Sequence, residues 1–144
     1  MILISHRGNL NGSNKDFENR PEYINNALSK GFNVEVDVNI YKSKIFLGHD
    51  EPQYKINYNF LLNKKIWCHA KDILALERLK KIKATYYWHQ KDEYTITSNG
   101  YFWTYPGAKL VKNSICVMPE NANYKNISCA GICSDFIIKY KKKN

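Results

Sequence analysis

The segment FNVEVDVNI, residues 32–40, carries a clear signal of secondary structure. Its apolar and polar residues alternate, which is the pattern of a β-strand whose side chains point to opposite faces of a sheet. The three valines share one face, and Glu35 and Asp37 share the other. We therefore expect a strand with one apolar face and one acidic face.

Glu35 and Asp37 are unusual residues for an otherwise apolar strand. Burying two carboxylates side by side without partners is costly. A hard divalent cation removes that cost, because carboxylate oxygens are the ligands that Mg²⁺ and Ca²⁺ prefer. Two alternatives stay open at this point: the acidic face meets solvent, or lysine and arginine side chains neutralise it.

The segments on either side of this strand predict an α/β protein. MILIS, residues 1–5, is expected to be a short buried strand, and a helix is expected over residues 21–30. A second helix is expected at DILALERLKKI, residues 72–82, after further extended pieces. From residue 84 onward, short extended segments follow one another with little room for helices. The early β-α-β order favours a parallel sheet.

The length of the chain limits the architecture. A full (β/α)₈ barrel usually needs more than about 200 residues, and this chain has 144. We therefore predict a single domain over residues 1–144, folded as a compressed TIM-like (β/α) barrel with parallel strands and several outer helices missing. Residues 139–144 are predicted to form a basic tail.

The net charge of +9 favours anionic partners such as phosphates, nucleic acid or an acidic membrane surface. No apolar run approaches the roughly 20 residues of a membrane-spanning helix. The first residues lack the basic region and cleavage site of a signal peptide. We expect a cytoplasmic protein whose four cysteines are reduced and act mainly as buried thiols.

All four histidines fall at or near the ends of predicted strands. Sites in α/β folds are built at the strand ends. His49 follows an apolar strand and a glycine, and it precedes Asp50, a carboxylate placed to orient the imidazole. We therefore expect histidines to take part in the chemistry of the site.

The segment 86–107 is unusually aromatic. We expect its rings mainly to fill the space that absent helices leave, because buried aromatic side chains dominate small cores. The alternative is a wall around the pocket, in which a ring stacks on a sugar or lipid head group. The candidates for this wall are Tyr86, Trp88, Trp103 and Tyr105.

Four short motifs occur in a fixed order, namely His6-Arg7-Gly8, Glu18-Asn19, Glu35-Val36-Asp37-Val38 and His49-Asp50. In this order and spacing they resemble the glycerophosphodiester phosphodiesterase family, whose barrel is related to that of phosphatidylinositol-specific phospholipase C. The resemblance is strong over residues 1–52. Beyond these it is carried by His69-Ala70-Lys71 and by residues 131–135, which look like the last strand of the family.

The resemblance implies a metal-dependent phosphodiester hydrolase acting on glycerophosphodiesters or a related polyol or lipid-head-group phosphodiester. It implies that His6 and His49 are the general acid and base. It implies that the phosphate, or the loop beside it, is held by Arg7, Lys71 and Asn19. It implies that a divalent metal, Mg²⁺ or Ca²⁺, is held by Glu35, Asp37, Glu18 and His69.

His69 departs from the family pattern, which has a carboxylate at this position. Imidazole is a poorer ligand than carboxylate for Mg²⁺ or Ca²⁺ and a better one for Mn²⁺ or Zn²⁺. Mn²⁺ therefore also fits the prediction, unless Glu18 or Glu120 supplies the third ligand. The chain is also short after Lys71, so loops that select the substrate in larger relatives are expected to be missing.

Two other functions compete with a hydrolase of small-molecule phosphodiesters. The first is a non-catalytic anion- or phosphate-binding module on a degenerate barrel. The second is a nucleic-acid binder, which we do not expect, because the basic residues follow no known binding motif. No transmembrane segment is expected, and the oligomeric state stays open.

Overall fold

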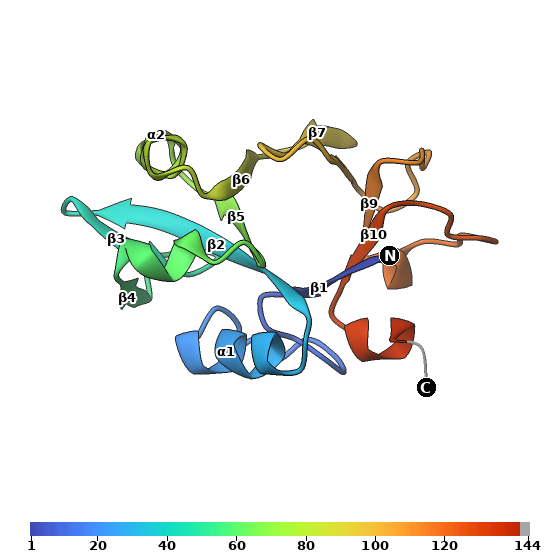
Figure 1. Cartoon of the computed structure of the whole chain (residues 1–144), viewed down its shortest axis with the longest axis horizontal. Coiled ribbons are helices and arrows are strands. Elements are labelled where there is room, and N and C mark those ends of the chain that lie inside the picture. The colour runs from blue at the N-terminus through green and yellow to red at the C-terminus, as the bar shows by residue number, and fades with distance from the viewer. Residues whose placement is uncertain (142–144) are drawn as a thin grey trace.

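The computed structural model describes residues 1–141 and shows one curved β-sheet with two α-helices packed against it (Figure 1). The strands, in chain order, are β1 (Ile2–His6), β2 (Asn33–Tyr41), β3 (Lys44–Leu47), β4 (Tyr54–Ile56), β5 (Ile66–Ala70), β6 (Thr85–Trp88), β7 (Tyr94–Ile96), β8 (Phe102–Thr104), β9 (Ser114–Val117) and β10 (Gly131–Ser134). The α-helices are α1 (Pro21–Ser29) and α2 (Ile73–Ile82), and the 3₁₀ helices are η1 (Tyr58–Leu62), η2 (Pro119–Asn121) and η3 (Ile137–Tyr140). Within residues 1–141, no helix combines the length and the apolar character needed to cross a bilayer.

Strand β2 is the centre of the sheet. Along one edge it pairs with β1 in parallel and then with β3 in antiparallel orientation, and along the other edge it pairs with β5. From β1 the sheet continues through β10, β9, β8 and β7, and from β5 it continues to β6. The sheet curves into a half-barrel (Figure 1), and a hydrogen bond from Ser98 N to Tyr86 O, 2.8 Å, links the segments after β7 and in β6.

The predicted TIM-like (β/α) barrel with parallel strands is wrong. The sheet is mixed, because β3 runs antiparallel to both β2 and β4, and β7 runs antiparallel to β8. The reason is local: Lys42 and Ser43 have φ values of +47° and +62° and form a tight turn after β2. Such a turn returns the chain antiparallel, whereas a parallel return needs a crossover of about a dozen residues.

The two predicted helices are confirmed. Helix α1 begins at Pro21, whose fixed φ suits the first turn, and it buries Ile24 and Ala27. Helix α2 begins after Asp72, whose side chain accepts a hydrogen bond from Ala75 N. In the first turn of α2, Ile73 is 69% exposed, and the buried residues of the helix are Ala75 and Leu79.

Both faces of β2 are buried, which excludes the alternative that its acidic face meets solvent. The valines join the larger apolar cluster, which also contains the buried residues of α1 and α2. Glu35 and Asp37 are only 1% and 0% exposed on the other face. A second apolar cluster contains Trp67, Tyr87 and Trp103, so two rings of the aromatic segment 86–107, Tyr87 and Trp103, fill space as predicted.

The described part of the predicted basic tail contacts the rest of the fold. Lys139 and Tyr140 of the predicted basic tail belong to η3, and Lys141 Nζ donates to Lys30 O at 3.0 Å. Residues 142–144 of that tail lie outside the described residues. All four cysteines are free, and three of them are buried, as expected.

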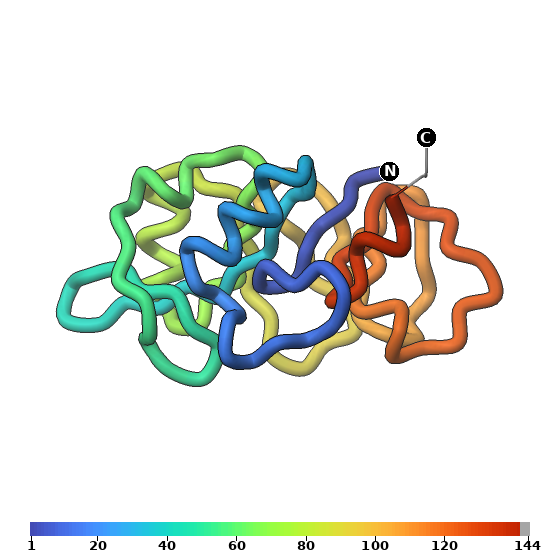
Figure 2. Tube along the Cα trace, turned by 90° about the horizontal axis from the view of Figure 1, so that it is seen from below, coloured from blue at the N-terminus to red at the C-terminus, as the bar shows by residue number. Residues whose placement is uncertain are grey.

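The strand ends meet at one end of the molecule. Figure 2 shows the loops that follow β1, β3 and β6 at one end and the N-terminus at the other. The loop after β3 is held by a hydrogen bond from Gly48 N to Asp37 O, 3.1 Å, and by one from Asn39 Nδ2 to Gly48 O, 2.7 Å. Gly48 therefore fixes where the next residue, His49, is placed.

We expect Gly48→Ala to destabilise the protein strongly. Gly48 has φ +151°, and a Cβ there would lie 2.0 Å from Glu51 O. Gly100 is a matched control, because its φ is +90° but a Cβ would meet nothing within 4 Å. Urea denaturation should show a loss of about 1 kcal/mol for Gly100→Ala and more than about 2 kcal/mol for Gly48→Ala. Equal losses would show that the clash does not matter.

Candidate functional site

The predicted site residues come from separate strands and meet at one end of the sheet. Glu35 and Asp37 lie on β2, His6 ends β1, His69 lies on β5, and His49 follows β3. The His6 Nε2 atom is 3.8 Å from Glu35 Oε2, and His49 Nδ1 is 3.4 Å from Asp37 Oδ2. Parallel pairing of β1, β2 and β5 aligns their carboxyl ends and so brings His6 and His69 to the acidic residues of β2. His49 arrives by the antiparallel return of β3, which pairs Leu47 with Val38.

The acidic pair, Glu35 and Asp37, carries two buried oxygen atoms without hydrogen-bond partners, Glu35 Oε2 and Asp37 Oδ1. Burial, together with the charge of Asp37, raises the pKa of Glu35. Burial also opposes ionisation of Asp37, but the positive charge of Arg7 and the hydrogen bond from the Asn19 amide hold its pKa well below the usual range. Asp37 is therefore ionised, whereas ionisation of Glu35 is unfavourable unless a positive charge lies beside it.

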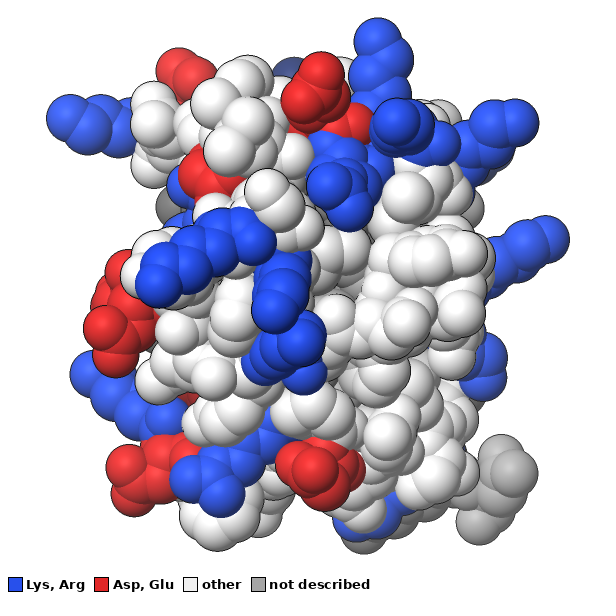
Figure 3. Space-filling model, turned by 90° about the vertical axis from the view of Figure 1, so that its left-hand side faces the viewer, with Lys and Arg blue, Asp and Glu red and all other residues white. Residues whose placement is uncertain are grey.

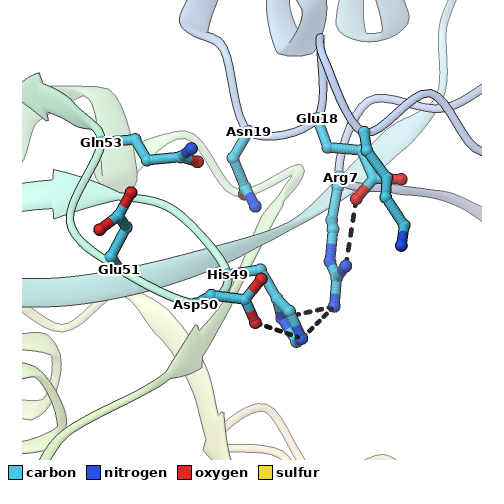
Figure 4. Close-up of a pocket in the computed structure, with 8 residues that line it drawn as sticks. Arg7, Glu18, Asn19, His49, Asp50, Glu51 and Gln53 are labelled. Carbon is cyan, nitrogen blue, oxygen red and sulfur yellow. Dashed lines mark hydrogen bonds and ion pairs between the residues drawn. The ribbon is translucent and has the colours of Figure 1, made fainter.

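Arg7 lies at the centre of the site, between Glu18 and His49 (Figure 4). Its Nη1 atom donates to Glu18 Oε2 at 3.1 Å and its Nη2 atom to His49 Nδ1 at 2.6 Å. Its Nε atom forms an ion pair with Asp37 Oδ2 at 2.8 Å, although the N–H is not aligned for a hydrogen bond. Burial opposes the charge of Arg7, but these carboxylates raise its pKa above the ordinary value.

The backbone around Arg7 is strained and tied down. Arg7 and Asn19 have φ values of +55° and +63°, which non-glycine residues rarely adopt. Arg7 N donates to Glu35 O at 2.9 Å, and Asn19 N donates to Arg7 O at 3.0 Å. The Asn19 side chain forms two hydrogen bonds with Asp37, each 2.9 Å long. Asn19 Nδ2 donates to Asp37 Oδ2, and Asn19 Oδ1 accepts from Asp37 N. Asn19 therefore fastens its loop to β2, as the resemblance implies.

His6 is held by a residue that sequence reasoning did not assign to the site, Asp135. The His6 Nδ1 atom lies 2.7 Å from Asp135 Oδ1. Because Asp135 carries a lowered pKa, its carboxylate accepts and Nδ1 carries the ring proton. The lone pair of Nε2 then faces Glu35. The only sequence signal for Asp135 was its place directly after the last strand.

His49 has the opposite arrangement. A guanidinium only donates, so the short contact with Arg7 makes His49 Nδ1 an acceptor and places the ring proton on Nε2. The expected partner Asp50 is 3.6 Å from Nε2, and its side chain is 93% exposed. Arg7, not Asp50, therefore fixes the orientation of this ring.

His69 lies beside the acidic pair. Its Nδ1 atom is 3.4 Å from Asp37 Oδ1 and 3.9 Å from Glu35 Oε1, and its Nε2 atom is 3.2 Å from the carbonyl oxygen of His89. A carbonyl only accepts, so Nε2 carries a proton and Nδ1 faces the two carboxylates. The ring stacks on Tyr87 at 4.8 Å, and the Tyr87 hydroxyl donates to Glu35 Oε1 at 3.3 Å.

These three side chains fit a divalent cation. One ligand atom from each of Glu35, Asp37 and His69 lies within 4.8 Å of the others. Two donors on one cation are separated by at most about twice the bond length, roughly 4–5 Å. The cation would give partners to the two unpaired carboxylate oxygens, and it would explain why His69 Nδ1 faces acids. The set has one nitrogen and two oxygen donors.

Two further predicted ligands lie elsewhere. Glu18 is outside the ligand cluster and accepts hydrogen bonds from Arg7, Asn9 and Ser13. Glu120 accepts from Ser134 Oγ and from Asp135 N, so it supports the end of β10. Glu18 therefore orients Arg7, and neither residue replaces His69.

Two cavities adjoin the site, and His49 lines both of them. The first, about 400 Å³, is bordered by Arg7, Asn19 and the loop after β3 (Figure 4). The second, about 450 Å³, is bordered by Lys71 and by residues that follow β6. Lys71 Nζ is 3.8 Å from Asp37 Oδ1, so a second positive charge does reach the acidic pair.

No protein-family model, curated protein or solved structure matches this chain. The family resemblance of the motifs therefore stays a prediction. The function has to be inferred from the geometry of the site.

The His6–Asp135 pair predicts how the stability of the metal-free protein depends on pH. Burial lowers the pKa of His6, but the hydrogen bond to Asp135 and the charge of Glu35 raise it above its ordinary 6.5. The pair therefore stabilises the fold fully below pH 6.5, and this contribution is lost as the pH rises through the folded-state pKa. With chelator present, the unfolding free energy of His6→Gln should fall less steeply than that of wild type above pH 6.5. Parallel curves would contradict the pairing.

The ligand set predicts a metal preference. Wild type should bind Mn²⁺ or Zn²⁺ more tightly than Mg²⁺ or Ca²⁺ by about tenfold or more, because imidazole is a poor ligand for the hard cations. His69→Asp, which supplies three carboxylates, should shift the preference toward Mg²⁺ and Ca²⁺. Titration calorimetry measures both, and Glu35→Gln is the control that should lose binding of all four ions. The same ranking in wild type and His69→Asp would exclude His69 as a ligand.

Proposed function

We propose that the protein is a metal-dependent phosphodiester hydrolase acting on glycerophosphodiesters or a related polyol or lipid-head-group phosphodiester. One observation carries the proposal: His6 and His49 flank the buried acidic pair, and their Nδ1 atoms contact partners of opposite kind, the Asp135 carboxylate and the Arg7 guanidinium. Phosphodiester cleavage needs one group that accepts a proton and one that gives a proton. A pair of histidines in opposite states supplies both.

The tautomers assign the two roles. His6 Nε2, with its free lone pair, takes the proton from the attacking water or from an internal hydroxyl as the new O–P bond forms. Asp135 holds the ring in this state through Nδ1. His49 Nε2–H gives its proton to the leaving alkoxide as the old P–O bond breaks, and Arg7 keeps Nδ1 as the acceptor.

The remaining residues stabilise negative charge on the phosphoryl oxygens. Arg7 and Lys71 bring positive charge to the site from opposite sides of Asp37. Glu35, Asp37 and His69 would hold the divalent cation, Mg²⁺, Ca²⁺ or Mn²⁺, and a cation bound there polarises the phosphate. Fixed charges in a buried site stabilise a developing charge more strongly than the same charges in water.

The distribution of charge supports a small anionic ligand. Figure 3 shows lysine and arginine side chains spread over the face that carries α2 and the β2–β3 hairpin, with acidic side chains among them. A binder of nucleic acid that follows the phosphate backbone needs a connected basic groove. We place the protein in the cytoplasm, where its four free thiols stay reduced.

A second function is favoured by one observation about Arg7. All its side-chain nitrogens already face Glu18, His49 or Asp37. Two of the five N–H groups of the guanidinium donate hydrogen bonds, to Glu18 and His49, so Arg7 can offer the remaining N–H groups to an anion while it stays paired. The alternative is therefore a non-catalytic module that binds an anion beside the acidic pair.

Hydrolysis assays separate the two functions. Wild type should cleave glycerophosphodiesters or bis(p-nitrophenyl) phosphate with added Mn²⁺ or Mg²⁺ and lose this activity with chelator. His6→Ala and His49→Ala should lower kcat by a factor of about 10²–10⁴, the usual contribution of a general acid or base. The control is Lys64→Gln, a change at an exposed residue just before β5, at the end of that strand away from the site. Circular dichroism checks that each variant is folded. Folded wild type that cleaves nothing with any metal would support the binding module.

A further inference from the structure

The second cavity beside His49 has its own chemistry. We call it the basic cavity, because its charged lining includes Lys71 and Lys91 and, among the described residues, no carboxylate. The cavity on the other side of His49 is lined by Glu18, Asp50 and Glu51 as well as by Arg7 and Lys15. The two sides of the site therefore differ in charge.

The wall that carries Lys91 is a fixed turn. Thr95 Oγ1 donates to Trp88 O at 2.8 Å, and Tyr105 N donates to Glu93 O at 2.9 Å. The His89 ring stacks on Tyr105 at 3.6 Å and bonds to the carbonyl oxygen of Asp92. The exposed side chain of Lys91 is thus presented by a pre-organised loop.

Lys71 forms the opposite, more buried part of the lining. Its side chain is 21% exposed, and its backbone N donates to Val38 O at 2.9 Å. Its ammonium group reaches Asp37 only at 3.8 Å, so it keeps donors for a ligand. The acidic neighbours of Lys91 in the chain, Asp92 and Glu93, do not line the cavity.

Because His49 lines both cavities, a phosphodiester cleaved beside it places one ester arm on each side. We propose that the basic cavity binds a phosphate monoester carried by one alcohol of the substrate, with Lys71 and Lys91 as its cationic partners. This inference rests on the proposed function. It narrows the substrate class to phosphodiesters of a short alcohol that bears a second phosphate.

The test compares two chromogenic substrates that differ only in this phosphate. One is p-nitrophenyl glycerol phosphodiester, and the other carries a further phosphate on the terminal glycerol hydroxyl. Wild type at low salt should show a kcat/KM about tenfold higher for the phosphorylated substrate, and the advantage should shrink as salt screens the charges. Lys91→Gln should reduce that advantage roughly threefold, and Lys91→Glu should reduce it further.

Matched controls keep the result specific. Lys65→Gln changes an exposed lysine just before β5, at the end of that strand away from the site, and should leave both substrates unaffected. The unphosphorylated substrate should react equally well with wild type and with both Lys91 variants. Equal kcat/KM for the two substrates in wild type, or equal losses on both in the variants, would overturn the proposal.

Calorimetry separates this proposal from the hydrolase proposal. If wild type cleaves neither substrate, the hydrolase function fails, and glycerol 1,3-bisphosphate is compared with glycerol 3-phosphate as a ligand. Tighter binding of the bisphosphate that is lost in Lys91→Glu would support the second phosphate site. Equal affinity for the two compounds would exclude it.

Discussion

The burial of two carboxylates on one face of β2 is the constraint on which the site depends. Glu35 and Asp37 cannot reach water, so each neighbouring strand must bring a group that compensates them. Arg7 from the end of β1, His69 from β5 and Lys71 just after it all contact this face. The valines on the opposite face anchor β2 to the helices, so the acidic pair cannot turn away. Packing energy thereby holds a charge arrangement that is unfavourable in isolation.

The sequence predicted the local elements better than their connection. The strand expected from the alternation of residues 32–40 and the helices expected over residues 21–30 and 72–82 rest on local patterns, and the structure confirms all three elements. The parallel barrel failed because the turn at Lys42–Ser43 is a tight hairpin that pairs β3 with β2 in antiparallel orientation, whereas the sequence pattern showed a turn and an extended segment but not their pairing. A chain that turns back there cannot form the crossover that a parallel pair needs.

The candidate site shows the same division. Alignment of the parallel strands β1 and β2 brought His6, Glu35 and Asp37 together as the sequence suggested, whereas the antiparallel hairpin of β2 and β3 brought His49 beside Asp37. The partner of His6 was not assigned, because Asp135 lies 129 residues away and no local pattern connects them. Asp50 was expected to orient His49 because it follows that residue directly, but its side chain is exposed to solvent.

The three contacts of Arg7 also constrain how this chain can evolve. A substitution of Arg7, Glu18 or Asp37 leaves at least one partner charged, partly or fully buried, and unpaired. The effects of substitutions at these positions on stability are therefore non-additive. Loss of one charged residue is tolerated better once the oppositely charged partner has already been replaced. Because of this epistasis, single substitutions in the ion network are disfavoured. A change in the chemistry of the site requires coordinated replacement of several residues. The site then persists in descendants even where the strands and loops around it diverge.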